Sequence, residues 1–181
     1  MRRVALDISP LRYPDFRRLW VGQGVSFLGF QVTAVAVPIQ IFGLTHSSLW
    51  VGLLGLASLL PLVVFGLWGG AVADIMDRRR LVLVASSTTW LATWGLVAQA
   101  VLHSRSPVLL LALTAVQSAG FAISGPTRGA IIPRLVPVDL VPAANTANFL
   151  VQSVGAIAGP LVGALVVAHA GFADAYAIDA A

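Results

Sequence analysis

The sequence predicts an all-α membrane protein, a helical bundle of about five transmembrane helices with the start of a sixth. Its 181 residues are 58% hydrophobic and only 10% charged, whereas a soluble domain carries roughly 25% charged residues. Several apolar runs reach the length of about 20 residues that a helix needs to cross a bilayer. Alternating strands of about ten residues, which would indicate a membrane barrel, are not seen in the sequence. Helices are therefore expected, because hydrocarbon offers no partner to an unpaired backbone group.

The first 18 residues, MRRVALDISPLRYPDFRR, are polar and twice interrupted by proline. A cleavable signal peptide would place its apolar segment directly after the first charges. We therefore expect residues 1–18 to form a cytoplasmic N-terminal segment and residues 19–181 to form the transmembrane region. The five spans are expected at about residues 19–42, 49–73, 81–102, 107–124 and 145–170, with a sixth starting near Tyr176.

The arginines fall almost entirely on one side of the predicted membrane. When connections are counted alternately, ten of the 11 arginines lie on the N-terminal side and Arg105 alone lies on the other. Cytoplasmic loops carry the excess of arginine and lysine. We therefore expect a multi-pass protein of the plasma (cytoplasmic, inner) membrane with its N-terminus in the cytoplasm. Nucleic-acid binding is not expected, because these arginines flank apolar spans and no aromatic platform lies between them.

Several kinds of chemistry are not expected from this composition. The chain has no cysteine, which excludes disulfides and thiolate metal sites. His46, His103 and His169 are scattered at the outer ends of spans, so we expect no metal site. No Gly-x-x-x-x-Gly-Lys loop is present, so we expect neither ATP drive nor a cofactor. No span offers a nucleophile, a base and an orienting acid together, and we expect no catalytic residues and no enzyme.

The connection after the second span, GGAVADIMDRRR, gathers glycines, acids and arginines. A small residue such as Gly70 lets another helix approach closely. Asp74 is costly near a helix C-terminus, where the dipole is already negative, so it needs a positive partner. A solvated loop that obeys the positive-inside rule explains Arg78 and Arg79 fully, but it explains neither the glycines nor Asp74.

The pattern Gly-x-x-x-Asp-x-x-x-Arg-Arg resembles the loop signature of major facilitator superfamily transporters. The resemblance implies a cytoplasmic latch in which Gly70 allows close approach and Asp74 faces the positive N-terminus of a helix in the other six-helix half. Arg78 and Arg79 would be the supporting cations. Ile75 stands where the signature has arginine, and Asp77 where it has glycine, so the charge network differs from the family pattern.

A second motif lies in the fifth span, where Gly155, Gly159, Pro160 and Gly163 form Gly-x-x-x-Gly-Pro-x-x-Gly. Glycines four residues apart make a smooth face for helix packing, and proline removes one backbone hydrogen bond. The motif is also similar to the antiporter signature of drug-efflux members, with Ala164 in place of the final glycine. DFRRLWVGQGVSFLG and GPTRGAIIPRLVPVDLVPAANTAN likewise resemble the efflux branch that holds enterobactin and macrolide exporters.

In this superfamily twelve helices form two halves, so the resemblance implies that the chain corresponds to most of the N-terminal half. It implies a secondary active transporter that exports a small amphipathic molecule, siderophore or drug-like, by alternating access with proton coupling. The implied partners are the small-molecule substrate, the coupling proton and membrane lipid, with a monomeric full-length form. The alternative is a truncated, non-transporting membrane protein, or a half-transporter that needs a partner chain.

Charged groups are sparse within the spans. Secondary transporters couple through a carboxylate embedded in the membrane, but no aspartate lies in the middle of a predicted span. The sequence therefore identifies no proton carrier, and we expect it in the other half. Arg128, at the cytoplasmic end of the fourth span, is a candidate gate residue that would pair with Asp139 or Asp77. A simple membrane anchor explains Arg128 equally well.

Uncharged polar residues inside the spans are candidates for the substrate path. Gln23, Gln31 and Gln152 are selected as cavity residues, because a few polar groups in an apolar pocket orient a small ligand. Phe27, Phe30 and Trp94 are candidate apolar or stacking walls. The alternative for the glutamines is hydrogen bonding between helices, which is worth about 0.6 kcal/mol on average.

Overall fold

The fold is a bundle of α-helices, as the sequence predicts. The computed structural model describes residues 8–75, 78–129 and 131–180, without the side chains of residues 68–75, 78–79 and 125–129. Those residues contain no strand, and α1 to α5 are each long and apolar enough to cross a membrane. The α-helices are α1 (Pro14–Thr45), α2 (Ser48–Ile75), α3 (Arg78–Val101), α4 (Pro107–Gly129), α5 (Val141–His169) and α6 (Phe172–Ala180), and the short 3₁₀ helices are η1 (Ser9–Arg12), η2 (Ile132–Arg134) and η3 (Val138–Leu140).

Local sequence signals account for the helix ends. Helix α1 begins at Pro14, inside the segment expected to be cytoplasmic, because proline has no N–H to satisfy and a φ suited to the first helical turn. It ends where His46 takes a left-handed conformation with φ of 49° and donates its backbone N–H to Phe42 O at 2.8 Å. Helix α6 follows Gly171, which has φ of 95°, and therefore starts a few residues before Tyr176.

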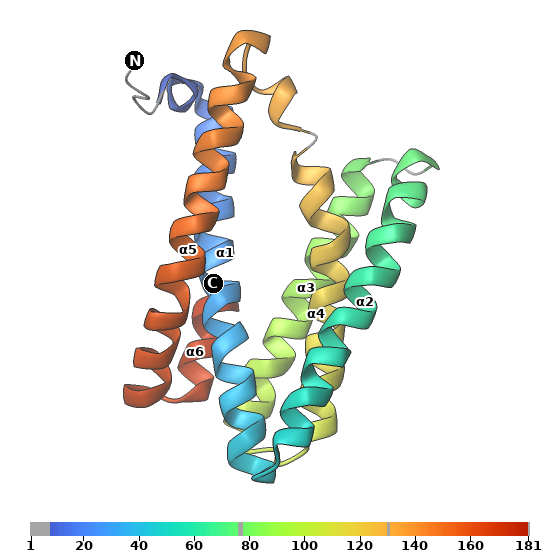
Figure 1. The fold of residues 1–181 in the computed structure, drawn as a ribbon, viewed down its shortest axis with the longest axis vertical. Helices are drawn as coiled ribbons and strands as arrows, with labels where there is room; N and C mark the ends of the chain where they lie inside the picture. Colours follow the sequence, from blue (N-terminus) through green and yellow to red (C-terminus); the bar gives the residue numbers. More distant parts are fainter. Residues whose placement is uncertain (1–7, 76–77, 130, 181) are drawn as a thin grey trace.

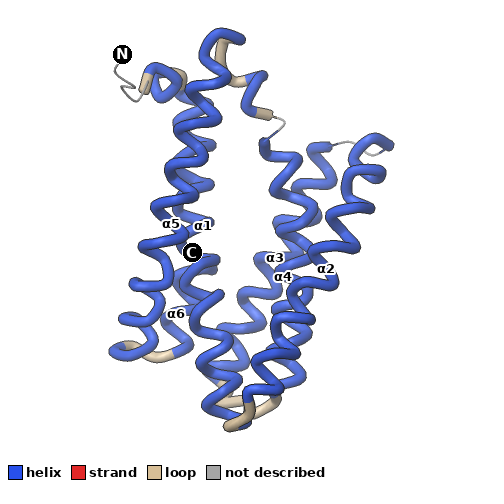
Figure 2. The backbone as a smooth tube through the Cα atoms, in the orientation of Figure 1, coloured by secondary structure: helices blue, strands red, loops and turns tan. Residues whose placement is uncertain are grey.

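The helices form two groups that separate toward one end of the molecule. Helix α1 packs mainly against α5 and α6, and α4 packs mainly against α2 and α3, while α3 and α6 join the groups. Figures 1 and 2 show the groups close together at the α1–α2 turn and apart at the end that carries the N-terminus. Helix α1 packs on α5 as α4 packs on α2. The two pairs correspond when α1 is matched with α4 and α2 with α5, each three places later in the chain, as expected for a repeat of three helices.

Helix α5 packs its glycine face against α1. Gly155, Gly159 and Gly163 are buried, and a Cβ atom added to Gly155 would lie 2.6 Å from a ring carbon of Phe27. A Cβ at Gly163 would lie 3.1 Å from Val32 Cα. The opposite face of α5 is exposed, with Ile157 at 71%. The ladder therefore brings two helix backbones together and leaves the large side chains for lipid.

Helix α2 is the least buried of the five candidate spans. Only 6% of the most apolar stretch of 18 residues in α2 is buried inside the described structure. Its exposed side chains include Leu56, Leu60, Val63 and Leu67, which in water would be an aggregation-prone patch.

A polar cluster inside an apolar core closes the bundle at the end away from the N-terminus. Gln99 Nε2 donates to Gln40 Oε1 at 3.0 Å, and Gln40 Nε2 donates back to Gln99 Oε1 at 3.4 Å. The Tyr176 hydroxyl donates to Gln40 Oε1 at 2.6 Å. These hydrogen bonds join α1, α3 and α6, and the side chains around them, including Ile41 and Leu96, are fully buried.

Candidate functional site

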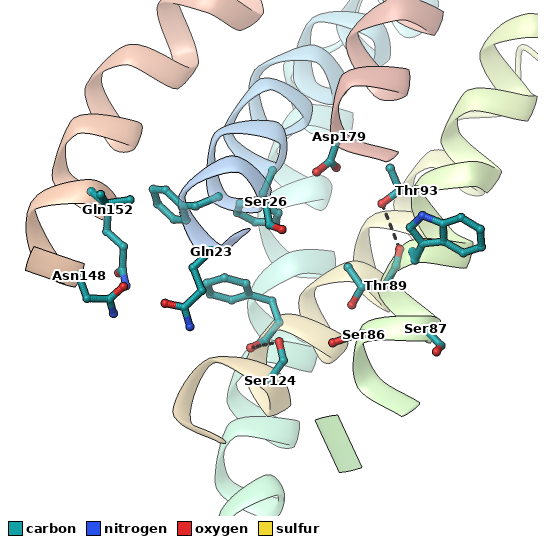
Figure 3. A pocket seen from close by; sticks show the side chains of 15 residues that line it. Gln23, Ser26, Ser86, Ser87, Thr89, Thr93, Ser124, Asn148, Gln152 and Asp179 are labelled. Carbon is teal, nitrogen blue, oxygen red and sulfur yellow. Dashed lines mark hydrogen bonds between the residues drawn. The ribbon is translucent and has the colours of Figure 1, made fainter. Parts of the chain in front are cut away.

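A cavity of about 720 Å³ lies between the two helix groups. This volume falls within the roughly 300–1,000 Å³ range of small-molecule sites. Figure 3 shows Asn148 and Gln152 on one side of it, and Thr89, Thr93 and Asp179 on the other. Its described lining residues are Gln23, Ser26, Phe27, Phe30, Ser86, Ser87, Thr89, Trp90, Thr93, Phe121, Ser124, Asn148, Val151, Gln152 and Asp179.

Two of the three glutamines selected from the sequence line this cavity. Gln23 and Gln152 are among its lining residues, but Gln31 is not. The Cβ atom of Gln31 lies against Gly159, where α1 and α5 pack. A polar residue in a span can line a cavity, but whether it does depends on the helix face on which it lies. Gln31 thus lies at the helix interface and outside the described lining of this cavity, and its role in a substrate path stays a prediction.

Aromatic residues form the apolar walls. Phe27 and Phe30 line the cavity as expected, and the Phe30 ring stacks on that of Phe121 with centroids 5.1 Å apart and an 8° angle between the planes. Trp94 is not a lining residue. Its place is taken by Trp90, one turn earlier, against which Trp94 packs edge to face at 5.9 Å. The cavity thus presents ring faces from α1, α3 and α4.

The sequence analysis missed a carboxylate inside the bundle. Asp179 of α6 lines the cavity, and its Oδ2 accepts hydrogen bonds from Thr33 Oγ1 at 2.8 Å and Gln117 Nε2 at 3.5 Å. Gln117 Nε2 also donates to Thr93 Oγ1 at 2.7 Å. The sequence predicted no aspartate in the middle of a span, and Asp179 lies among the helices because α6 packs into the bundle against α1 and α3. The place of the proton carrier stays a prediction. The available signal was a single aspartate in the apolar run AYAIDA.

A glycine on α1 allows this approach. Gly29 is buried, and a Cβ atom added to it would lie 2.8 Å from Asp179 Cα and 3.0 Å from Asp179 Oδ1. Trp90 Nε1 donates to the backbone carbonyl of Ala180 at 2.9 Å. The position of Asp179 is therefore fixed by close backbone contact with α1 and by a hydrogen bond from α3.

The residues of the predicted latch and gate lie outside the described side chains. The backbone places Gly70 and Asp74 in the last turns of α2, and Arg78 and Arg79 in the first turn of α3. Arg128 belongs to the last turn of α4. The latch and the gate stay predictions.

The fifth-span motif has a defined place but an untested role. Its glycines pack on α1, as described above, and Pro160 lies inside α5. This packing accounts for the glycines without reference to antiport, so the antiporter role stays a prediction. The described residues contain no group of three or more histidine or acidic side chains placed to hold a metal ion.

The cavity lies nearer the arginine-rich end of the bundle. Its lining residues come from the early parts of α1, α3 and α5 and from the late part of α4. Figure 1 shows the N-terminus and the connection between α4 and α5 at this same end. Arg105 lies at the opposite end, between α3 and α4. The other described arginines all lie at the cavity end: Arg12, Arg17, Arg18, Arg78, Arg79, Arg80, Arg128 and Arg134.

Comparisons with known proteins agree with this architecture. Residues 5–181 match the family model described as transmembrane secretion effector, MFS_3. The chain is 32% identical over 182 residues to enterobactin exporters EntS of Escherichia coli O1:K1, Escherichia coli O157:H7 (strain EC4115) and Shigella boydii serotype 18. Each match covers 97% of this chain and 42% of the relative, so the chain spans less than half the length of these relatives. No solved structure matches it. The chain belongs to the transmembrane secretion effector family, a branch of the major facilitator superfamily.

Proposed function

We propose that the protein is a secondary active exporter of a small amphipathic molecule, siderophore or drug-like, that works by alternating access. The observation that carries this proposal is the cavity of about 720 Å³ with polar and aromatic walls inside a membrane-spanning bundle. Secondary transporters bind their substrates near the bilayer midplane between structural repeats. The names of the related enterobactin exporters support efflux as the direction and a siderophore as one candidate cargo.

The two ends of the bundle support an inward-facing state. Every described arginine except Arg105 belongs to the end near the cavity, which by the positive-inside rule is cytoplasmic. The other end is closed by the cluster of Gln40, Gln99 and Tyr176. We therefore place the protein in the plasma membrane with its N-terminus in the cytoplasm, loading substrate from that side. A proton gradient is the proposed drive, and monomers are the proposed working form in the lipid bilayer.

The direct test measures cargo accumulation. Cells with and without the complete coding sequence are loaded with a panel of siderophores and amphipathic antibiotics, and intracellular cargo is followed over time. The proposal predicts lower accumulation of at least one compound in expressing cells and loss of the difference when an uncoupler collapses the proton gradient. Equal accumulation for the whole panel would contradict export, and a difference that survives the uncoupler would contradict proton drive.

We further propose that Gly70, Asp74, Arg78 and Arg79 form the cytoplasmic latch, with Arg128 as a gate residue at the same end. Asp74→Asn is expected to lower the export rate while the amount of protein in the membrane stays near that of the wild type, because only the charge that engages the other half is lost. Initial export rates normalised to protein in isolated membranes measure this.

The control for the latch experiment is Asp15→Asn. Asp15 is an exposed carboxylate at the same end, with its side chain 73% exposed and 3.8 Å from Arg18, so its removal should change little. Export by the Asp74 variant at the level of the Asp15 variant would refute the latch.

A half-transporter that needs a partner chain is the second candidate. The specific observation in its favour is that the chain covers 42% of the length of its relatives. Expression of residues 1–181 alone, beside expression of the complete coding sequence, separates the candidates. Export restored only when a second, separately expressed chain is present would favour the half-transporter.

A further inference from the structure

We propose that Asp179 binds the positive charge of the cargo, so that the cavity selects amphipathic molecules with a protonated amine over neutral or anionic molecules of the same shape. This inference rests on the proposed export function, because it names the charge class of the exported molecule. The proposed class of cargo follows from the charges and aromatic rings of this cavity and is not taken from the names of the relatives.

The first argument is the charge balance of the cavity. Among its described lining residues Asp179 is the only charged side chain, and none is arginine or histidine. The hydrogen-bond partners of Asp179, Thr33 and Gln117, are neutral donors. A carboxylate inside a membrane bundle is costly until a positive charge compensates it. Within the described cavity, that charge can come only from what enters.

The second argument is the shape of the polar network. Thr33 on α1 and Gln117 on α4 both donate to Oδ2, and Gln117 is itself held by Thr93 on α3. Three helices thus fix the orientation of the carboxylate while leaving its charge in place. A site preorganised in this way binds a cation without first rearranging its ligand group.

The third argument is the aromatic wall around the acid. Trp90 donates its indole N–H to the carbonyl of Ala180, the residue next to Asp179, and the stacked Phe30 and Phe121 rings line the same cavity. Aromatic faces attract cations through the ring quadrupole and also accept apolar groups. Together with Asp179 they suit a molecule with an aromatic or apolar body and a cationic end, and they offer no compensation to an anion.

The arginines at the cytoplasmic end do not oppose this selection. Arg80 and Arg134 are exposed at the end of the bundle, where salt screens charges separated by more than about 8 Å. They lie outside the described cavity lining.

Cation binding at Asp179 also provides a chemical basis for the exchange of a proton for the cargo. When a protonated amine binds, the ammonium pairs with the Asp179 carboxylate, and a proton that binds the same carboxylate neutralises it and competes with the amine. The described groups hydrogen-bonded to Asp179, to its partners or to the residue beside it are Thr33, Gln117, Thr93 and Trp90, and none of them titrates near neutral pH. Asp179 is therefore the described group for which a proton and the cation compete.

Three probes with one aromatic body test the inference. Dansylcadaverine carries a protonated amine, its N-acetyl derivative is neutral, and dansyl-6-aminohexanoate carries a carboxylate. Binding to the purified complete protein in detergent is measured by equilibrium dialysis. We expect the wild type to bind the cationic probe about tenfold more tightly than the neutral one and to bind the anionic probe most weakly.

The variants are Asp179→Asn, Asp179→Glu and Asp174→Asn. Asp179→Asn should reduce the preference for the cation to within about threefold by weakening that probe alone, whereas Asp179→Glu should retain the preference. Asp174 is the matched control, because it is an exposed acid on the same helix, α6, and its replacement should leave all three affinities unchanged.

Two results would overturn the inference. In the first, Asp179→Asn weakens all three probes alike, which assigns the residue to the shape of the cavity. In the second, Asp179→Asn and Asp174→Asn have the same effect. Uptake of the neutral probe into inverted vesicles, measured separately, tests the proposed function. Charge-selective binding without any transport would refute export and support the cation site. Transport without charge selection would support export and refute the cation site.

Discussion

Replacing Gly29 by alanine is expected to reduce export by about tenfold or more while the protein still inserts into the membrane. The added Cβ atom would lie 2.8 Å from the backbone Cα of Asp179, and a backbone atom cannot swing aside as the end of a side chain can. Helix α6 must therefore shift away from α1. The 2.8 Å hydrogen bond from Thr33 to Asp179 would be lost or lengthened, and the carboxylate would leave its place in the cavity.

Gly22→Ala is the matched control for this experiment. Gly22 lies on the same helix two turns earlier, and an added Cβ there has nothing within 4 Å. Alanine raises the helix propensity equally at both positions, by about 1 kcal/mol, so the comparison isolates the contact with α6. Initial export rates, normalised to protein in the membrane, decide the outcome. Equal rates for the two variants would show that α6 does not need its close contact with Gly29.

Gly159→Leu is expected to prevent stable packing of α5 on α1. Even a Cβ atom at Gly159 would overlap Cβ of Gln31, and that atom sits too close to the α1 backbone to move alone. Overpacking of a tight contact costs about 1–3 kcal/mol and more when a whole side chain is added. We expect a loss of folded protein after extraction in mild detergent, because the interface also carries Gly155 and Gly163.

Ala156→Leu provides the comparison, since Ala156 is an exposed residue on the same helix and receives the same side chain. Size-exclusion chromatography and thermal unfolding in detergent measure the two variants side by side. A monodisperse Gly159→Leu protein with the melting temperature of Ala156→Leu would contradict the close helix contact.

The helices of this fold could be predicted because membrane solvation acts on each segment by itself. A run of about 20 apolar residues must become a helix whatever surrounds it, so α1 to α5 follow from composition and length. The glycine ladder of α5 was also visible, since its four-residue spacing places Gly155, Gly159 and Gly163 on one face.

The cavity could be predicted only in part, because its residues are chosen by the relative rotation and approach of helices. Gln23, Gln31 and Gln152 are equally polar in the sequence, yet Gln31 lies on the α5 side of α1, where Gly159 accepts it. Asp179 was missed for a related reason. Its importance arises from the contact of α6 with α1, which depends on Gly29, a glycine 150 residues earlier in the sequence that no spacing rule connects with it.

The hydrogen bonds among Gln40, Gln99 and Tyr176 have a mechanical consequence. The Tyr176–Gln40 bond fastens α6 to α1, and the Gln40–Gln99 pair fastens α1 to α3. Asp179 sits on α6 less than one turn from Tyr176. Sliding α6 along α1 would break the Tyr176–Gln40 hydrogen bond inside an apolar core. A motion that carries the acid from one side of the membrane to the other and keeps this hydrogen bond must therefore move α6 and α1 together.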